Sequence, residues 1–196
     1  VALRDGSHAI QHQYTEEQIR TITKGLDEAK VPYIEVSHGD GIGGSSVQYG
    51  FSHTSDILLI KAAKEETTNS KISVLLLPGI GTVEDLKEAR EAGADMVRIA
   101  THSTEADVSR QHIVAAKEMG MEVVGFLMMA HMATPEKILE QAQLMESYGA
   151  DIIYATDSAG TLLPNEVTER IELLVKELNV PVGFHAHNNL GLAMAN

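Results

Sequence analysis

Short apolar segments alternate along the chain with longer segments in which apolar residues recur at helical spacing. The apolar segments predict strands over Val1–Leu3, Val31–Val36, Ile72–Leu77, Met96–Ala100, Val123–Met129, Ile152–Ala155 and Val182–Phe184. The segments of helical spacing predict helices over Thr15–Ala29, Ser55–Glu66, Val83–Ala92, Ser103–Met119, Pro135–Tyr148 and Asn165–Leu178. Start signals such as Thr134-Pro135 and stop signals such as Gly93 and Gly149 support these helices.

Strands that alternate with helices in this way predict a parallel sheet with right-handed crossovers. The strands are almost continuously apolar, as expected when both faces of a sheet are covered. No glycine fingerprint follows the first strand, and polar residues follow most strands, so the pattern favours a (β/α)₈ TIM barrel over a doubly wound sheet. We expect one α/β domain over residues 1–196, with the first strand beginning before Val1. We also expect a helix to begin at Ala193–Asn196, and the eighth strand and a C-terminal domain to lie beyond it.

Composition narrows the classes of partner. The chain has 196 residues, a formal net charge of −13 and no cysteine. The acidic balance argues against nucleic-acid binding and against anionic membranes. No apolar segment approaches the roughly 18 residues that a membrane helix needs, and the lack of cysteine excludes a disulfide scaffold. We therefore expect a cytoplasmic protein with neither nucleic-acid nor membrane partners.

Polar side chains gather where the predicted strands end. In a barrel of this kind the catalytic groups stand at the carboxyl ends of the strands. Residues at or just after such ends are Arg4, Asp5, His8, Glu35, His38, Arg98, His102, His131, Asp157, Ser158, His185 and His187. A single catalytic face is the simplest interpretation, although structural salt bridges would also place charged residues there.

His185 and His187, in the segment "GFHAHNNLG", suggest a metal site. Residues two apart on a strand point to the same face, so the two imidazoles would converge. Two histidines and one carboxylate suit a divalent ion with open positions for substrate. Asp5 is the natural carboxylate, because only the eighth strand would separate it from the histidines in a closed barrel. Among nine histidines, however, a His-x-His pair can also arise by chance.

Other strand-end residues suggest the chemistry around that metal. Arg4 could bind a carboxylate or enolate oxygen, or form a structural ion pair. His8 could act as a general base or be an exposed loop histidine, and His38 could contact substrate. A Schiff-base aldolase would need a lysine at a strand end, but all nine lysines fall in helical segments or just before strands. Carbanion chemistry here would therefore need a metal as its electron sink.

Seven segments spread over the chain resemble the family of 4-hydroxy-2-oxovalerate aldolases, which are pyruvate-dependent metal aldolases. The segments are "LRDGSHA", "IEVSHGDGIGGSS", "LLLPGIGT", "VRIATHSTEAD", "GFLMMAHMA", "YATDSAGTLLP" and "GFHAHNNLGLAMAN". The family shares a broad superfamily with hydroxymethylglutaryl-CoA lyase and isopropylmalate synthase. "SHGDGIGGSS" and "TDSAG" favour the aldolase branch, whereas "HAHNNLG" is common to the superfamily.

The resemblance implies a fragment of a carbon–carbon lyase that cleaves 4-hydroxy-2-oxopentanoate to pyruvate and acetaldehyde during meta-cleavage of aromatic compounds. It implies manganese, or cobalt or magnesium in its place, held by Asp5, His185 and His187. Arg4 would stabilise the enolate and His8 would accept a proton. Substrate would be bound by Arg4, Ser158 and His185, with Leu75 and Leu77 shaping the aldehyde pocket.

The resemblance also implies groups that this segment of chain does not hold. The family uses a tyrosine from a C-terminal region and a C-terminal domain that binds an acylating acetaldehyde dehydrogenase. That dehydrogenase and a second copy of the chain are the expected protein partners. Two alternatives remain open: an acyl-CoA lyase or Claisen synthase of the same superfamily, and a catalytically inert fragment or interaction module.

Overall fold

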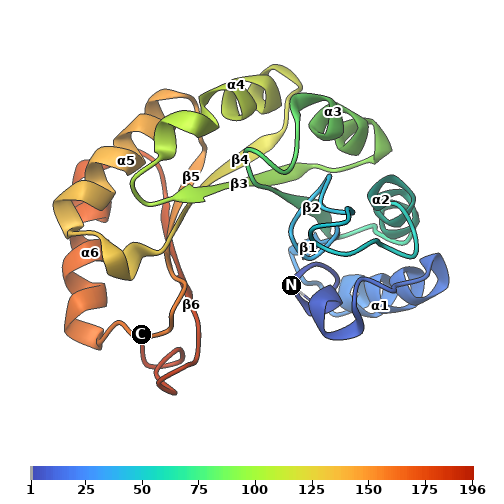
Figure 1. Ribbon diagram of the computed structural model, residues 1–196, viewed down its shortest axis with the longest axis horizontal. Helices are drawn as coiled ribbons and strands as arrows, with labels where there is room; N and C mark the ends of the chain where they lie inside the picture. Colours follow the sequence, from blue (N-terminus) through green and yellow to red (C-terminus); the bar gives the residue numbers. More distant parts are fainter. Residues whose placement is uncertain (1) are drawn as a thin grey trace. The chain divides into compact units, whose positions relative to one another are not determined.

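The computed structural model describes residues 2–196, in which strands and helices alternate (Figure 1). The strands are β1 (Tyr33–Glu35), β2 (Lys71–Leu76), β3 (Met96–His102), β4 (Glu122–Met128), β5 (Ile152–Asp157) and β6 (Val182–Ala186). The α-helices are α1 (Glu16–Glu28), α2 (Asp56–Glu65), α3 (Val83–Ala92), α4 (Arg110–Glu118), α5 (Pro135–Ser147) and α6 (Pro164–Glu177). Three short 3₁₀ helices are η1 (Asp5–Ile10), η2 (Ala106–Ser109) and η3 (Ala130–Met132).

The strand order is β1-β2-β3-β4-β5-β6, and the registered pairs are parallel. A doubly wound sheet would reverse its order part-way along the chain, whereas a barrel keeps the order of the sequence. The fold is therefore α/β and consistent with an incomplete TIM barrel, as predicted.

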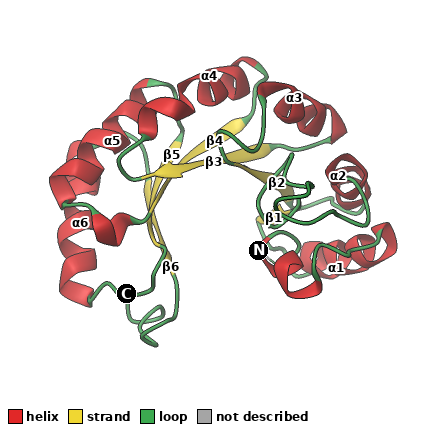
Figure 2. Cartoon of the chain, viewed as in Figure 1, coloured by secondary structure: helices red, strands yellow, loops and turns green. Residues whose placement is uncertain are grey.

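The chain divides into two compact units, and each has its own helices (Figure 2). Unit 1 comprises Val1–Arg98 and Glu118–Glu122, and unit 2 comprises Ile99–Lys117 and Val123–Asn196. In unit 1, β1 pairs with β2 so that Ile34 lies opposite Ile72. In unit 2, β4, β5 and β6 pair so that Phe126, Tyr154 and Gly183 form one row across the strands.

The helices begin where side chains satisfy the free backbone groups of the first turn. The side chains of Thr15 and Thr82 each accept a hydrogen bond from the amide of the residue three positions on, and that residue's side chain accepts one from the amide of the cap. At the other end of α3, Gly93 has φ of 115°, a left-handed conformation that glycine adopts without strain. These local signals explain why the predicted and observed helices agree so closely.

In unit 2 the two faces of the strands have different neighbours. Gly125 faces α5, and a Cβ there would lie 2.7 Å from the sulfur of Met145. The alternate residues Phe126 and Tyr154 face the other way, with ring centroids 6.1 Å apart. By register His185 belongs to this second face, and its ring lies edge-on to Phe126 with centroids 5.4 Å apart.

Three predicted elements differ from the structure. Ala2 and Leu3 lie in a turn before η1, not in a strand, because no described strand pairs with their backbone; Val1 lies outside the described residues. The predicted helix at Ser103–Met119 is divided into η2 and α4, since the Ser109 hydroxyl donates to the Ala106 carbonyl and competes with helical bonding. Residues 193–195 form a turn and not a helix; the Leu192 carbonyl accepts hydrogen bonds from the amides of Ala195 and Asn196.

Within the described residues, no helix combines the length and apolar character needed to cross a membrane.

Candidate functional site

In unit 1, Arg4 is a buried arginine whose position is set by three acceptors. Its Nε donates to Glu35 Oε2 at 2.8 Å, and its Nη1 donates to the Gly39 carbonyl and to Asp5 Oδ1, each at 3.2 Å. The remaining nitrogen, Nη2, has no hydrogen-bond partner among the described residues. Arg4 can therefore offer Nη2 to a ligand without giving up the bonds that hold its guanidinium.

Glu35 ends β1 and joins Arg4 to Arg98 of β3. Arg98 donates from Nε to Oε1 at 2.5 Å and from Nη2 to Oε2 at 2.6 Å. Burial by itself would raise the pKa of Glu35, but the hydrogen bonds and charges of Arg98 and Arg4 outweigh it and lower that pKa. Glu35 is therefore a carboxylate that holds two buried cations in place.

Asp5, a predicted metal ligand, begins η1 beside Arg4. Its side chain is 62% exposed, and within the described part of the chain it bonds to one nitrogen of Arg4 alone, so most of its acceptor capacity is open to other donors or to a cation. This is compatible with the predicted ligand role and does not test it.

His8, His12 and His38 form a stack in unit 1. The rings of His12 and His38 lie face to face with centroids 3.6 Å apart, and His8 meets His12 edge-on at 5.0 Å. His38 Nδ1 accepts from the Asp40 amide while its Nε2 donates to the Gly50 carbonyl, so the ring is neutral with its proton on Nε2. Burial lowers the pKa of both His12 and His38, and charge on neighbouring histidines adds to the effect.

Backbone geometry keeps this stack tight. A Cβ on Gly39 would lie 2.5 Å from His8 Nε2, so a larger residue there would have to displace the His8 ring. His8 itself is exposed, whereas His12 and His38 are buried. The predicted base is thus the accessible end of a packed row of imidazoles.

One group of the described residues, His8, His12 and Asp40, could hold a metal ion, because one ligand atom from each lies within 4.8 Å of the others. His12 Nδ1, however, already receives the Gly39 amide at 3.3 Å and contacts the Ser7 hydroxyl at 3.1 Å. Those bonds compete with a cation for the lone pair. The group differs from the predicted ligand set, which shares none of these three residues.

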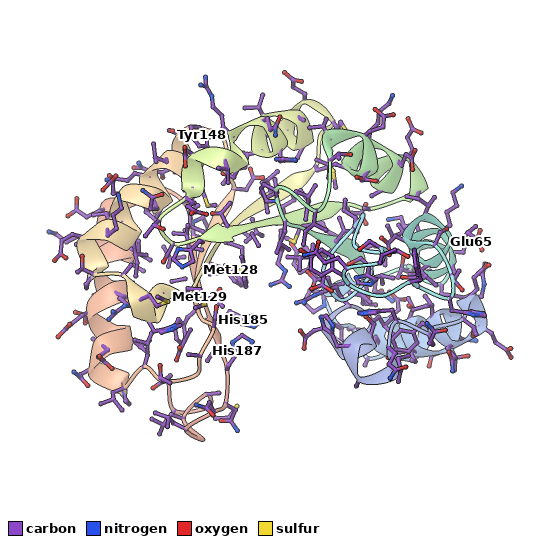
Figure 3. All side chains as sticks on the ribbon, viewed as in Figure 1. Glu65, Met128, Met129, Tyr148, His185 and His187 are labelled. Atoms are coloured by element: carbon purple, nitrogen blue, oxygen red, sulfur yellow. The ribbon has the colours of Figure 1, made fainter. Side chains whose placement is uncertain are left out.

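His185 and His187 stand together in unit 2. Figure 3 shows their side chains projecting from β6 and from the segment after it, away from α6. Their ring centroids are 5.0 Å apart with planes inclined by 62°. His187 Nδ1 lies 2.8 Å from the Asp157 carbonyl, which can only accept, so Nδ1 carries the proton and Nε2 keeps its lone pair. A metal-binding histidine is usually oriented by such a bond.

Ser158 follows β5 and is hydrogen-bonded to Met129 in the segment after β4. Met129 is labelled in Figure 3. Its Oγ accepts the Met129 amide at 2.9 Å, which leaves the hydroxyl proton available for another acceptor. Met129 has φ of 60° and ψ of 34°, an uncommon conformation for a residue with a side chain. Ser158 therefore stabilises a strained turn and retains a donor for a ligand.

Leu75 lies on β2 and Leu77 directly follows it. The two alternate positions share one face, and Leu75 is buried while Leu77 is partly exposed. Gly41 packs on this strand so closely that a Cβ there would lie 2.7 Å from the Leu75 carbonyl. The loop after β1 thus covers Leu75, and the sequence contains no periodic signal that predicts this contact.

The predicted residues therefore form two local groups. Unit 1 brings Arg4 to Asp5, and unit 2 brings His185 to His187. From the sequence, Glu35 is predicted only to be a polar residue at a strand end, with no specific role. The available signal was a carboxylate at the end of an apolar strand, in a chain with Arg4 directly after one predicted strand and Arg98 within another.

Comparison with known proteins places these groups in a family context. The HMGL-like family model matches residues 1–196. The 4-hydroxy-2-oxovalerate aldolases of Geobacillus thermodenitrificans and Geobacillus stearothermophilus are 65% and 66% identical over the whole chain. The chain spans 57% of the length of each of these two relatives.

Solved structures agree on the fold. The N-terminal domain of a candidate aldolase from Bacteroides vulgatus superposes with a TM-score of 0.83 at 26% identity, covering 100% of this chain and 65% of that one. The carboxyl transferase domain of Rhizobium etli pyruvate carboxylase gives 0.80 at 19% identity, covering 100% and 36%. The second likeness is one of fold alone.

Proposed function

Because the chain belongs to the HMGL-like family, we propose that the protein containing it is a divalent-metal-dependent aldolase. The proposed reaction is retro-aldol cleavage of 4-hydroxy-2-oxopentanoate to pyruvate and acetaldehyde. Relatives of 65% and 66% identity bear the name of that aldolase, which favours it over the acyl-CoA lyases and Claisen synthases. The observation that carries the proposal is the His185–His187 pair. The Asp157 carbonyl accepts the Nδ1 proton of His187, which leaves Nε2 of that ring to bind a metal.

The residues suit the metal that this chemistry needs. Asp5, His185 and His187 would hold a divalent ion, for which we propose manganese, with cobalt or magnesium as substitutes. The exposed carboxylate of Asp5 and the fixed tautomer of His187 supply the kind of donors that such an ion takes. When bound, the ion acts as a Lewis acid on the 2-keto group of the substrate.

The chain's own residues would then bind the substrate and move its proton. Ser158 donates its free hydroxyl proton to the pyruvate carboxylate, and His185 lies beside the same end of the substrate. His8 takes the proton of the 4-hydroxyl group, which lets the C3–C4 bond break and the aldehyde leave. Leu75 and Leu77 form the apolar wall against the aldehyde.

Arg4 would stabilise the enolate that remains after the aldehyde leaves, and protonation of that enolate at C3 would give pyruvate. Glu35, Gly39 and Asp5 accept hydrogen bonds from Nε and Nη1 of Arg4, so Nη2 is available. Nη2 would donate to the enolate oxygen on which negative charge develops. Because Glu35 and Gly39 hold the guanidinium beforehand, little reorganisation is needed when the charge appears.

The wider context is part of the same proposal. The enzyme would act in the cytoplasm, in meta-cleavage degradation of aromatic compounds. It would pass its aldehyde to an acylating acetaldehyde dehydrogenase bound through regions outside this chain, and could form a homo-oligomer. Residues 1–196 would be the catalytic domain.

Deuterium uptake into the methyl group of pyruvate tests the proposal. The full-length protein is incubated with pyruvate and Mn²⁺ in D₂O, with His185→Ala beside it and mass spectrometry as the readout. Exchange that needs both Mn²⁺ and His185 is the expected result. Absence of exchange in a folded protein that binds Mn²⁺ would refute the proposed enolate chemistry, and unchanged metal content in His185→Ala would remove His185 from the ligand set.

A further inference from the structure

Asp157 is a buried carboxylate at the end of β5 that contacts three other segments of unit 2. Its side chain is 1% exposed. Its Oδ2 accepts the Leu162 amide at 2.9 Å, which closes the loop after β5. Its backbone carbonyl accepts His187 Nδ1–H at 2.8 Å. Asp157 therefore sits between the segments that carry Ser158 and His187.

The second carboxylate oxygen of Asp157 has a facing group but no hydrogen bond. Among residues 2–196, neither Asp157 Oδ1 nor His131 Nδ1 has a hydrogen-bond partner, and both atoms are buried. The two atoms are 3.7 Å apart, a few tenths of an ångström beyond hydrogen-bond distance. Two buried polar atoms that face each other without bonding are an exception that requires a physical explanation.

His131 lies in η3, and η3 is anchored from two sides. Arg170 of α6 donates to the Ala130 carbonyl at 3.2 Å and to the Ala133 carbonyl at 3.0 Å. Met129, just before η3, is bonded to Ser158. The His131 ring is thus held against Asp157 on a braced loop, so a small movement of that loop is enough to close the gap.

Hydrogen bonds that serve a reaction are often long in the free protein and shorten when substrate binds. The loops after β5 and β6 are linked, since the Gly160 carbonyl accepts the Leu190 amide and a Cβ on Gly160 would lie 2.6 Å from the His187 carbonyl. The Met129–Ser158 hydrogen bond joins the loop after β4 to them. Movement that closes the His131–Asp157 gap would therefore also move the segments that carry Ser158 and His187.

We propose that His131 Nδ1–H bonds to Asp157 Oδ1 when the pyruvate end of the substrate binds, and that this bond positions Ser158 and His187. The inference rests on the proposed function and adds a positioning pair that no predicted role covers. Neither residue needs to touch the reacting atoms. The bond would set how well pyruvate and the metal are held, not the barrier of the proton transfer itself.

Three substitutions of His131 separate this role from others. Asn places its amide nitrogen near the position of imidazole Nδ1, Gln reaches the position of Nε2, and Ala offers no donor. In the full-length protein, with pyruvate exchange as the assay, we expect His131→Ala and His131→Gln to raise the KM for pyruvate roughly tenfold, the scale of a lost ligand-orienting contact. His131→Asn should stay within about twofold of wild type. His53→Ala, a change at an exposed histidine, is the control.

The outcomes are distinct. Rescue by Asn but not Gln, with kcat changed by no more than about threefold, supports the positioning pair. Rescue by Gln and not Asn would mean that Nε2 contacts the substrate, and an unchanged KM in His131→Ala would mean that the pair has no function; either overturns the proposal. If His131→Ala fails to fold, His131→Asn against His131→Gln still decides it.

Two further measurements do not depend on activity. With pyruvate present, the Mn²⁺ dissociation constant of His131→Ala should rise roughly tenfold and be restored by Asn. Imidazole ¹⁵N spectra of the metal-free wild type with pyruvate should show His187 with its proton on Nδ1, and His131→Ala under the same conditions should show a mixture of tautomers. If wild type exchanges no pyruvate protons, the proposed function fails, while these two results still support or overturn the pair.

Discussion

Replacement of Glu35 by alanine is the sharpest stability test that the structure offers. Glu35 accepts hydrogen bonds from Arg4 and from two nitrogens of Arg98, and the three side chains are 11% exposed or less. The substitution would remove the buried carboxylate that two guanidinium groups share, and Arg4 would keep only its contact with the exposed Asp5 as an ion pair among the described residues. Removing one partner of a buried ion pair costs about 3–5 kcal/mol of unfolding free energy.

That loss converts to a measurable shift in melting temperature. In a chain of this size each kcal/mol lowers Tm by about 2–4 °C, so Glu35→Ala should lower Tm by roughly 6–20 °C. Thermal unfolding followed by circular dichroism measures the shift, and urea unfolding at 25 °C gives the free energy independently. Glu35→Gln keeps the shape and one acceptor oxygen, so its loss should be smaller.

Glu65 provides a matched control, labelled in Figure 3. It also pairs with an arginine, Arg20, at 2.6 Å, but its side chain is 63% exposed. Exposed ion pairs contribute about 0–1 kcal/mol, so Glu65→Ala should lower Tm by no more than about 4 °C. If Glu35→Ala and Glu65→Ala shift Tm equally, the argument that burial makes Glu35 essential is wrong.

Three further predictions concern other positions. Asp27 accepts hydrogen bonds from the segment 68–70, which hold its pKa well below the usual range despite burial. The stability that the Asp27 carboxylate gives the folded chain should be complete above about pH 5 and lost as pH falls below about 4. The urea midpoints of wild type and Asp27→Asn should therefore converge in acid. Gly183→Ala would drive a Cβ into the Tyr154 ring and should cost about 1–3 kcal/mol, whereas Gly25→Ala, in open space on α1, should stabilise by about 0.5–1 kcal/mol by urea unfolding. Arg4→Ala should lower kcat for retro-aldol cleavage by about 10²–10³, measured as pyruvate release, and a loss below about tenfold would remove Arg4 as the enolate donor.

The sequence by itself determined most of the secondary structure. The helix predicted at Val83–Ala92 matches α3 residue for residue, because Thr82 and Gly93 act within one turn of the chain. The strand predicted at Met96–Ala100 is β3 apart from its last two residues. Apolar periodicity and caps are local, so they can be read without knowing the rest of the fold. The motif at His185 and His187 was equally readable, because alternation along a strand places both on one face.

Only the tertiary structure decided what these residues contact. Glu35 meets Arg4 and Arg98 across separations of 31 and 63 residues, and nothing near any of them in sequence specifies that pairing. The first predicted strand failed for the same reason, since a strand exists only when a neighbour completes its hydrogen bonds. The tautomer of His187 likewise follows from the carbonyl of Asp157, 30 residues away. Periodicity fixes which face a side chain takes, whereas its partner depends on register between distant strands, and register is a property of the folded chain.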